Sequence, residues 1–225
     1  MRAWENRPDT YVCDEPFYAH YLLNTEVDHP GKEEVIADQE NDWRKVAAWL
    51  TGPVPGNKAV FYQKHMAHHF LKGMDDDWLD QLVHVFLIRH PKDMLISLSK
   101  VLKEPCLRDT GLAHQWDLFQ IIRRRTGKTP MVIESESILK NPRAALSMLC
   151  ESLDVPFYDS MRSWPSGPRD TDGIWAKWWY ANVLQSTGFN PYKPSTATLP
   201  DELKPLYAEC NQYFERLKEH SLAIS

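Results

Sequence analysis

Short apolar segments alternate with amphipathic segments between residues 10 and 135. Four apolar or β-branched runs end in polar residues and predict buried strands: TYVCDEP, KAVFYQKH, LVHVFLIRHP and TPMVIESES. Between these runs, apolar residues recur at helical spacing, as in Trp43, Val46, Ala47 and Leu50. This alternation predicts an α/β fold in which a mostly parallel sheet is flanked by helices. In such folds, ligands bind at the carboxyl ends of the strands.

Proline positions mark the starts of two predicted helices. Pro91 and Pro142 stand where a first helical turn accepts proline, because the N–H that proline lacks would have no partner there. Residues 154–198 are rich in Pro, Gly and Trp and predict an irregular segment, followed by a last helix near residues 200–218.

Composition limits the possible classes of protein. The 225 residues are 43% hydrophobic and 12% aromatic, which suits a single domain over residues 1–225. A net charge of -5 and a pI near 6.0 give no basic field for nucleic acid or membrane, so a small molecule is the expected partner. The polar start MRAWENRPDT and the lack of a long apolar run predict a cytoplasmic protein, whose oligomeric state stays open.

The run FLIRHPKDMLISLSK, residues 86–100, contains the first candidate site. Arg89 ends a predicted strand, and a guanidinium can hold a phosphate through two parallel hydrogen bonds. Ser97 lies about two turns into a helix that begins near Pro91, where its hydroxyl can donate to the same phosphate. From these residues alone, a salt-bridged strand-end arginine and a solvent-facing serine fit equally well.

At this point the sequence resembles a known family. RHPKDMLIS is similar to the 3'-phosphate-binding signature of sulfotransferases, which use 3'-phosphoadenosine 5'-phosphosulfate (PAPS). VIESESILKNPRAALSMLCESLDVPF resembles the strand, loop and Asn-Pro helix of the family, and DEPFYAHYL and GPRDTDGIWAKWWY resemble a bacterial sulfotransferase-like group. The resemblance implies a three-layer fold of the P-loop nucleotide-binding type. It also implies that Arg89 and Ser97 hold the 3'-phosphate of PAPS, and that a sulfuryl group passes to a hydroxyl or amine of an unidentified acceptor.

The run VFYQKHMAHHF offers candidate catalytic residues, because a histidine after a lysine-bearing strand is the general base in this family. The resemblance implies His65 as the base and Lys64 beside the sulfuryl group. Imidazole titrates near neutrality, and a flexible ammonium can stabilise charge on the departing oxygen. The family's lysine and histidine are separated by one residue, whereas here they are adjacent, so His68 stays open as the base.

The same histidines admit two other interpretations. His65 and His69 would share a helix face at i, i+4 and could chelate zinc, although no third ligand has recognisable spacing. Alternatively, the histidines cap the strand and pack on Phe70. We expect no metal.

The run GPRDTDGIWAKWWY resembles the family segment that closes over the 3'-phosphate and adenosine. The resemblance implies that Arg169 supplies a cationic contact, that Gly173 allows a close backbone approach, and that Trp175 is a stacking surface. An aromatic-rich lid that belongs to the core fits these residues equally well.

One family element is missing from the sequence. Sulfotransferases of this type hold the 5'-phosphosulfate in a loop between a first strand and a helix. MRAWENRPDT resembles that helix, and no Gly-rich or Ser/Thr-rich turn precedes a helix in the sequence. We therefore expect an upstream strand and loop of about 15 residues in the natural protein. The alternative is a diverged, non-catalytic nucleotide-binding or protein-binding module.

Overall fold

Two pairs of parallel strands form the framework of the fold, which a computed structural model describes for residues 1–194 and 196–224. The chain divides into two units, each built from two separate stretches. Unit 1 comprises Met1–Gln81 and Pro156–Phe189. Unit 2 comprises Leu82–Val155 and Asn190–Ser225. Among the described residues, no strand joins one pair to the other.

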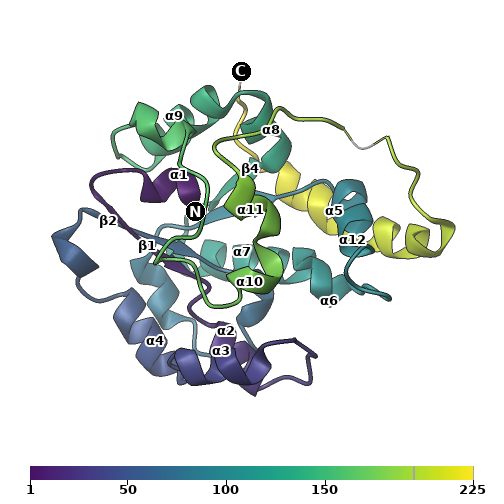
Figure 1. Ribbon diagram of the computed structural model, residues 1–225, viewed down its shortest axis with the longest axis horizontal. Helices are drawn as coiled ribbons and strands as arrows, with labels where there is room; N and C mark the ends of the chain where they lie inside the picture. Colours follow the sequence, from purple (N-terminus) through teal and green to yellow (C-terminus); the bar gives the residue numbers. More distant parts are fainter. Residues whose placement is uncertain (195, 225) are drawn as a thin grey trace. The chain divides into compact units, whose positions relative to one another are not determined.

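Unit 1 contains the strand pair β1 and β2 with short helices around it (Figure 1). Its elements are α1 (Arg2–Glu5), β1 (Thr10–Asp14), α2 (Tyr18–Leu23), α3 (Lys32–Asp38), α4 (Trp43–Leu50), η1 (Pro55–Asn57), β2 (Val60–Lys64), η2 (Ala67–His69), η3 (Asp77–Gln81), η4 (Asp159–Arg162), α10 (Ala176–Trp179) and α11 (Ala181–Gln185). The strands run parallel, from the pair Thr10 and Val60 to the pair Asp14 and Lys64. The carboxyl ends of both strands are therefore neighbours.

Local sequence explains how α4 and the core of unit 1 form. Asp42 caps α4, because its side chain accepts a hydrogen bond from the Arg44 N–H at 3.0 Å. The apolar positions of α4 are buried on one face, as their spacing predicted. A second cluster packs α2 and α3 against residues that follow much later in the chain, Trp175 and Tyr180. Unit 1 therefore depends on both of its chain stretches.

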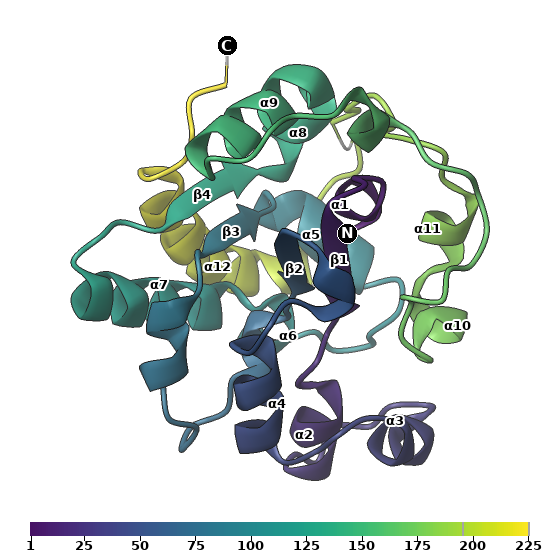
Figure 2. The same ribbon diagram turned by 90° about the vertical axis from the view of Figure 1, so that its left-hand side faces the viewer.

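Unit 2 contains the strand pair β3 and β4, with α12 beside α7 next to the strands (Figure 2). Its elements are β3 (Val85–Ile88), α5 (Pro91–Leu98), α6 (Leu107–Thr110), α7 (Leu112–Thr126), β4 (Met131–Glu134), α8 (Ser135–Lys140), α9 (Pro142–Ser152), η5 (Asp201–Leu203) and α12 (Lys204–Lys218). The pair is parallel, from Val85 and Met131 to Ile88 and Glu134. Gly127 ends α7 with a φ of 66°, a conformation that glycine adopts without strain.

The predicted α/β fold with parallel strands and flanking helices is confirmed, and both proline-marked helices begin where the sequence placed them. Pro91 opens α5 and Pro142 opens α9, each at the first helical position. The predicted irregular segment 154–198 is more ordered than expected, because it contains η4, α10 and α11. It also divides after Phe189 between the two units, and its residue 195 lies outside the described residues.

Candidate functional site

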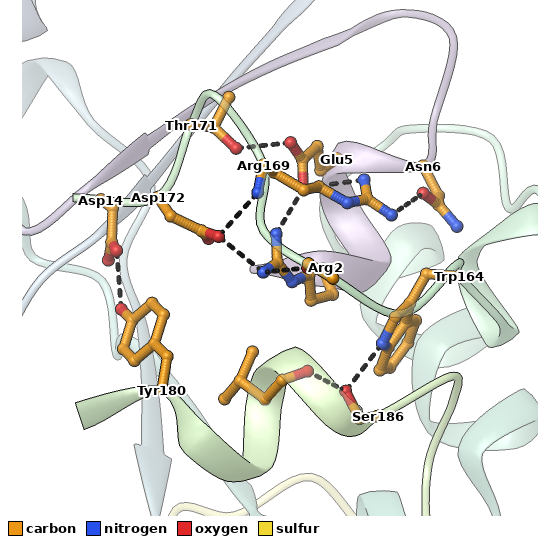
Figure 3. A network of polar contacts seen from close by, with 12 residues as sticks. Arg2, Glu5, Asn6, Asp14, Trp164, Arg169, Thr171, Asp172, Tyr180 and Ser186 are labelled. Carbon is orange, nitrogen blue, oxygen red and sulfur yellow. Dashed lines mark hydrogen bonds and ion pairs between the residues drawn. The ribbon is translucent and has the colours of Figure 1, made fainter. Parts of the chain in front are cut away.

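A lysine and two carboxylates meet where β1 and β2 end. Lys64 Nζ lies 3.0 Å from Asp14 Oδ1, donates to Tyr180 OH at 2.7 Å and also contacts Glu15 Oε1. The Tyr180 hydroxyl donates to Asp14 Oδ2 at 2.6 Å (Figure 3). We call these four residues the Lys64 cluster. All three protons of the Lys64 ammonium are engaged within it.

Burial and mutual attraction set the charges of the Lys64 cluster. Burial alone would lower the pKa of Lys64, but the carboxylates of Glu15 and Asp14 outweigh burial and raise it. Burial raises the pKa of Glu15, although Lys64 opposes that shift. Burial likewise raises the pKa of Tyr180, so its hydroxyl stays protonated. Lys64 is therefore a charge that the protein has already neutralised.

Glu15 is a functional candidate that the sequence reasoning missed. Its φ of 42° is left-handed, which is uncommon for a residue with a side chain, and such strain is frequent at functional sites. Its N–H donates to the Lys64 carbonyl at 2.8 Å, which continues the β1 and β2 pairing by one residue. The sequence signal that could have identified Glu15 was the acidic pair Asp14 and Glu15, directly after a predicted strand.

The three histidines of the run occupy different environments. His65 is exposed, with Nε2 at 3.3 Å from Gln63 Oε1 and its ring 5.7 Å from that of Phe17. His69 is buried and stacks on Tyr18, and burial, with the charges of its neighbours, lowers the pKa of His69 well below its usual value. His68 is half-buried and lies edge to face with His69. His65 is thus the best placed of the three to exchange a proton with a bound molecule.

The helix that zinc chelation by His65 and His69 requires is not formed. Residues Ala67–His69 make a single 3₁₀ turn, so i, i+4 neighbours do not share a face there. Across residues 1–194 and 196–224, the structure has no group of three or more His, Cys, Asp or Glu side chains suited to a metal ion.

The predicted phosphate contact Arg169 is engaged in a polar network (Figure 3). Its Nη1 lies 2.8 Å from Glu5 Oε2, and its Nη2 donates to Asn6 Oδ1 at 3.0 Å. Next to it, Arg2 Nη2 lies 2.8 Å from Asp172 Oδ2, which also accepts the Arg169 N–H at 2.9 Å. The role of Arg169 at the 3'-phosphate stays a prediction, and within unit 1 its charge joins α1 to residues 169–172.

Gly173 and Trp175 have packing roles within unit 1. A Cβ on Gly173 would lie 2.0 Å from Cζ2 of the Trp175 ring, so the ring requires a glycine there. Trp175 is 1% exposed and packs on Tyr18, which leaves no open ring face for stacking. The alternative interpretation, an aromatic-rich lid that belongs to the core, accounts for both residues. Their predicted roles as close approach and stacking surface stay predictions.

A cleft of about 320 Å³ lies beside β1 in unit 1, and we call it the β1 cleft. It is lined by Tyr11, Val12, Cys13, Asp14, Pro16, Gln39, Glu40, Val46, Trp49, Asp170, Thr171, Asp172, Gly173 and Trp175. Burial, helped by the nearby Asp14, raises the pKa of Cys13 to about 12, so this thiol is not a nucleophile at neutral pH. The β1 cleft shares Asp14 with the Lys64 cluster.

The predicted phosphate residues of unit 2 are exposed. Arg89 follows directly after β3, and no ion pair holds its guanidinium among the described residues. Ser97 lies in the last turn of α5, where its side chain is also exposed. The His90 side chain fixes the turn between them, because its Nδ1 accepts from the Lys92 N–H at 3.3 Å and caps α5. The salt-bridged alternative for Arg89 is therefore not what the structure contains.

Sequence comparison decides the family. A profile described as a sulfotransferase domain matches residues 1–215, which include parts of both units. The chain belongs to the sulfotransferase domain family. Among solved structures, it resembles the sulfotransferase domain of the Synechococcus PCC 7002 olefin synthase, with a TM-score of 0.51 and 16% identity over 96% of this chain and 89% of that one. This likeness supports the sulfotransferase fold.

Two plant proteins are similar to this sulfotransferase domain in sequence. Branched-chain-amino-acid aminotransferase-like protein 2 of Arabidopsis thaliana is 32% identical over 98% of this chain and 39% of its own length. Protein 1 of the same name is 34% identical over 89% of this chain and 36% of its own length. The chain thus spans less than half the length of these relatives, and their name describes them alone. Among the described residues, no helix has the length and apolar character that crossing a membrane requires.

Proposed function

We propose that this chain transfers a sulfuryl group from PAPS to a hydroxyl or amine of a small-molecule acceptor. The observation that carries the proposal is Arg89, an exposed strand-end arginine without an acidic partner among the described residues, in a chain of the sulfotransferase domain family. A charged group left without a partner at the carboxyl end of a parallel strand favours an anionic ligand.

Unit 2 supplies the phosphate-binding part of the proposal. The Arg89 guanidinium can donate two hydrogen bonds to a 3'-phosphate, and the exposed hydroxyl of Ser97 can donate a third. Both groups are uncommitted, so neither has to break an ion pair before it binds. These residues fit a phosphate group.

Unit 1 supplies the acid-base part. When bound, PAPS supplies the sulfuryl group, and its sulfur–oxygen bond to the 5'-phosphate breaks as the acceptor bonds to sulfur. His65 accepts the proton that the acceptor loses, which its exposure allows. Lys64 holds Asp14 and Glu15 in place, and in this arrangement it acts as a positioning residue.

Calorimetric titration with two nucleotides tests the phosphate site. Arg89→Ala should weaken binding of 3',5'-adenosine bisphosphate about 10- to 100-fold and leave 5'-adenosine monophosphate nearly unchanged, because a charge-assisted hydrogen bond contributes about 1.5–3 kcal/mol. Arg124→Ala, which removes another exposed arginine of unit 2, is the matched control and should change neither affinity. Equal losses for both nucleotides would contradict the assignment.

A non-catalytic binding module is the second candidate. The observation that favours it is the Lys64 ammonium, whose three protons are already engaged by Asp14, Glu15 and Tyr180. Incubation with labelled PAPS and a panel of hydroxyl and amine acceptors separates the two candidates. Nucleotide binding without any labelled product would favour the binding module.

A further inference from the structure

The β1 cleft lies along the edge of β1 that does not pair with β2. The Asp9 carbonyl accepts from the Val60 N–H at 3.0 Å, and the Glu15 N–H donates to the Lys64 carbonyl at 2.8 Å. Odd-numbered residues from 9 to 15 therefore turn their backbone groups toward β2. Because successive residues of a strand alternate, the N–H and C=O of Val12 point toward the opposite edge.

Within residues 1–194 and 196–224, the backbone groups of Val12 have no protein partner. Val12 is 4% exposed and lines the β1 cleft, yet no described residue bonds its N–H or C=O outside the pairing with β2. Buried backbone groups are almost always paired, with water or a ligand where protein is lacking. The edge of β1 therefore offers one donor and one acceptor to a molecule in the cleft.

A single hydroxyl group can satisfy both Val12 backbone groups, because a hydroxyl both donates and accepts. Two further unpaired atoms among the described residues, Trp175 Nε1 and Asp172 Oδ1, are buried and do not face a ligand in the cleft.

One carboxylate of the β1 cleft has no cationic partner. The lining includes four carboxylates and no Lys, Arg or His among the described residues. Cations outside the lining pair with three of them: Lys64 with Asp14, Lys45 with Glu40 and Arg2 with Asp172. Asp170 is exposed and makes no ion pair within residues 1–194 and 196–224. A carboxylate without a cationic partner repels phosphate groups and attracts a cation. The carboxylates are not grouped for a metal ion, which leaves an organic cation.

One wall of the β1 cleft is apolar. Trp49 is 43% exposed and lies on α4 with Val46, and both line the cleft. A flat indole face suits the C–H face of a saturated ring. A cleft of about 320 Å³ is at the lower end of the range for small-molecule sites.

These features together point to one class of ligand. We infer that the β1 cleft binds the acceptor and selects a small polyhydroxylated compound with a protonated amine, such as an amino sugar. Asp170 attracts the ammonium, the Val12 backbone groups bond a hydroxyl, and Trp49 covers the ring. This inference rests on the proposed function, because Asp14 links the cleft to the Lys64 cluster.

Binding of glucosamine and glucose to the full chain, without nucleotide, tests the inference. At about pH 6, below the usual pKa of an α-amino group, glucosamine should bind at least about tenfold more tightly than glucose. Asp170→Asn should reduce glucosamine binding severalfold without affecting the fold, because Asp170 is exposed. Trp49→Ala, which removes the exposed apolar wall, should weaken both sugars.

Glu33→Gln is the matched control, since Glu33 is an exposed acid of unit 1 outside the cleft lining. It should leave both affinities unchanged. Equal binding of glucose and glucosamine, or equal effects of Asp170→Asn and Glu33→Gln, would overturn the inference. Binding of an extended basic peptide along β1 in place of the sugar would also overturn it. Glucosamine binding without sulfate transfer would contradict the proposed function but support the assignment of the cleft. Sulfate transfer to acceptors without an amine, with no glucosamine binding, would support the proposed function but contradict the assignment of the cleft.

Discussion

Lys64 at the end of β2 and Arg89 just after β3 are both cations at the carboxyl end of a parallel strand, but their surroundings differ. Lys64 contacts Asp14, Glu15 and Tyr180, and its side chain is 27% exposed. Arg89 is exposed and has no ion pair among the described residues. One charge is neutralised by the fold, and the other is exposed to solvent.

The difference shows that position at a strand end does not by itself define a phosphate contact. A cation with two buried carboxylates beside it contributes to the fold, and its removal leaves those carboxylates uncompensated. A cation without partners contributes little to stability and can be committed to binding. Substitution of Lys64 should therefore mainly reduce stability, and substitution of Arg89 should mainly reduce ligand affinity.

The largest expected effect concerns His65, which directly follows Lys64 and is exposed. His65→Ala should lower turnover by about 10²–10⁴ while nucleotide affinity stays nearly constant, because a general base acts on the reaction and not on donor binding. Steady-state kinetics with nucleotide titration measure both quantities. If His68→Ala shows this pattern and His65→Ala does not, the base is His68.

The next largest effect compares the two cations directly. Lys64→Met should reduce the free energy of unfolding by about 3 kcal/mol, the lower end for breaking a buried ion pair, because water already reaches part of this side chain. Arg89→Ala should change it by no more than about 0.5 kcal/mol, as exposed substitutions usually do. Urea unfolding of both variants makes the measurement. Similar losses would contradict the contrast between the two strand ends.

A double variant sharpens the same comparison. Glu15→Gln removes one of the carboxylates that Lys64→Met leaves unpaired, so it should recover about 1–2 kcal/mol of the lost stability. The double-mutant cycle needs both single variants and the pair, measured by the same urea titration. Strictly additive losses would mean that Lys64 and Glu15 do not interact energetically.

The smallest effect is a pH dependence that originates at His69. Burial lowers the pKa of His69 well below its usual 6.5, so the unfolded chain binds this proton more readily than the folded one. The stability contribution is therefore present above pH 6.5 and lost as the pH falls below it, by up to about 1.4 kcal/mol per pH unit. His69→Phe keeps an aromatic ring stacked on Tyr18 and removes the titrating group. It should therefore reduce the slope of the unfolding free energy against pH below pH 6.5. An unchanged slope would assign the dependence to another group.

The sequence predicted the strands and the proline-marked helices because their signals are local. Periodicity and proline positions act within a few residues. The pairing of Asp14 with Tyr180 and the burial of Trp175 could not be predicted in this way, since they join residues far apart in the chain. Trp175 was expected to offer a ring face to a nucleotide, but aromatic residues in an irregular run also fill cores, and periodicity does not separate the two.

The same distinction between local and long-range signals applies to the site. Arg89 and Ser97 form a short local pattern, whose exposure the structure shows while their ligand stays a prediction. Glu15 was missed because its role comes from a left-handed backbone and from a lysine 49 residues later. The expected strand and phosphosulfate loop stay a prediction.

The interleaving of the two units has a consequence for how the protein is made. Unit 1 closes only when residues up to Phe189 are available, and unit 2 only when the stretch that contains α12 is available. The bond between Asp14 and Tyr180 spans 166 residues. Because a ribosome extends the chain by about 5–20 residues per second, Tyr180 is synthesised many seconds after Asp14. The acidic residues of DEP therefore stay hydrated through most of synthesis, and the site is assembled among the last steps of folding.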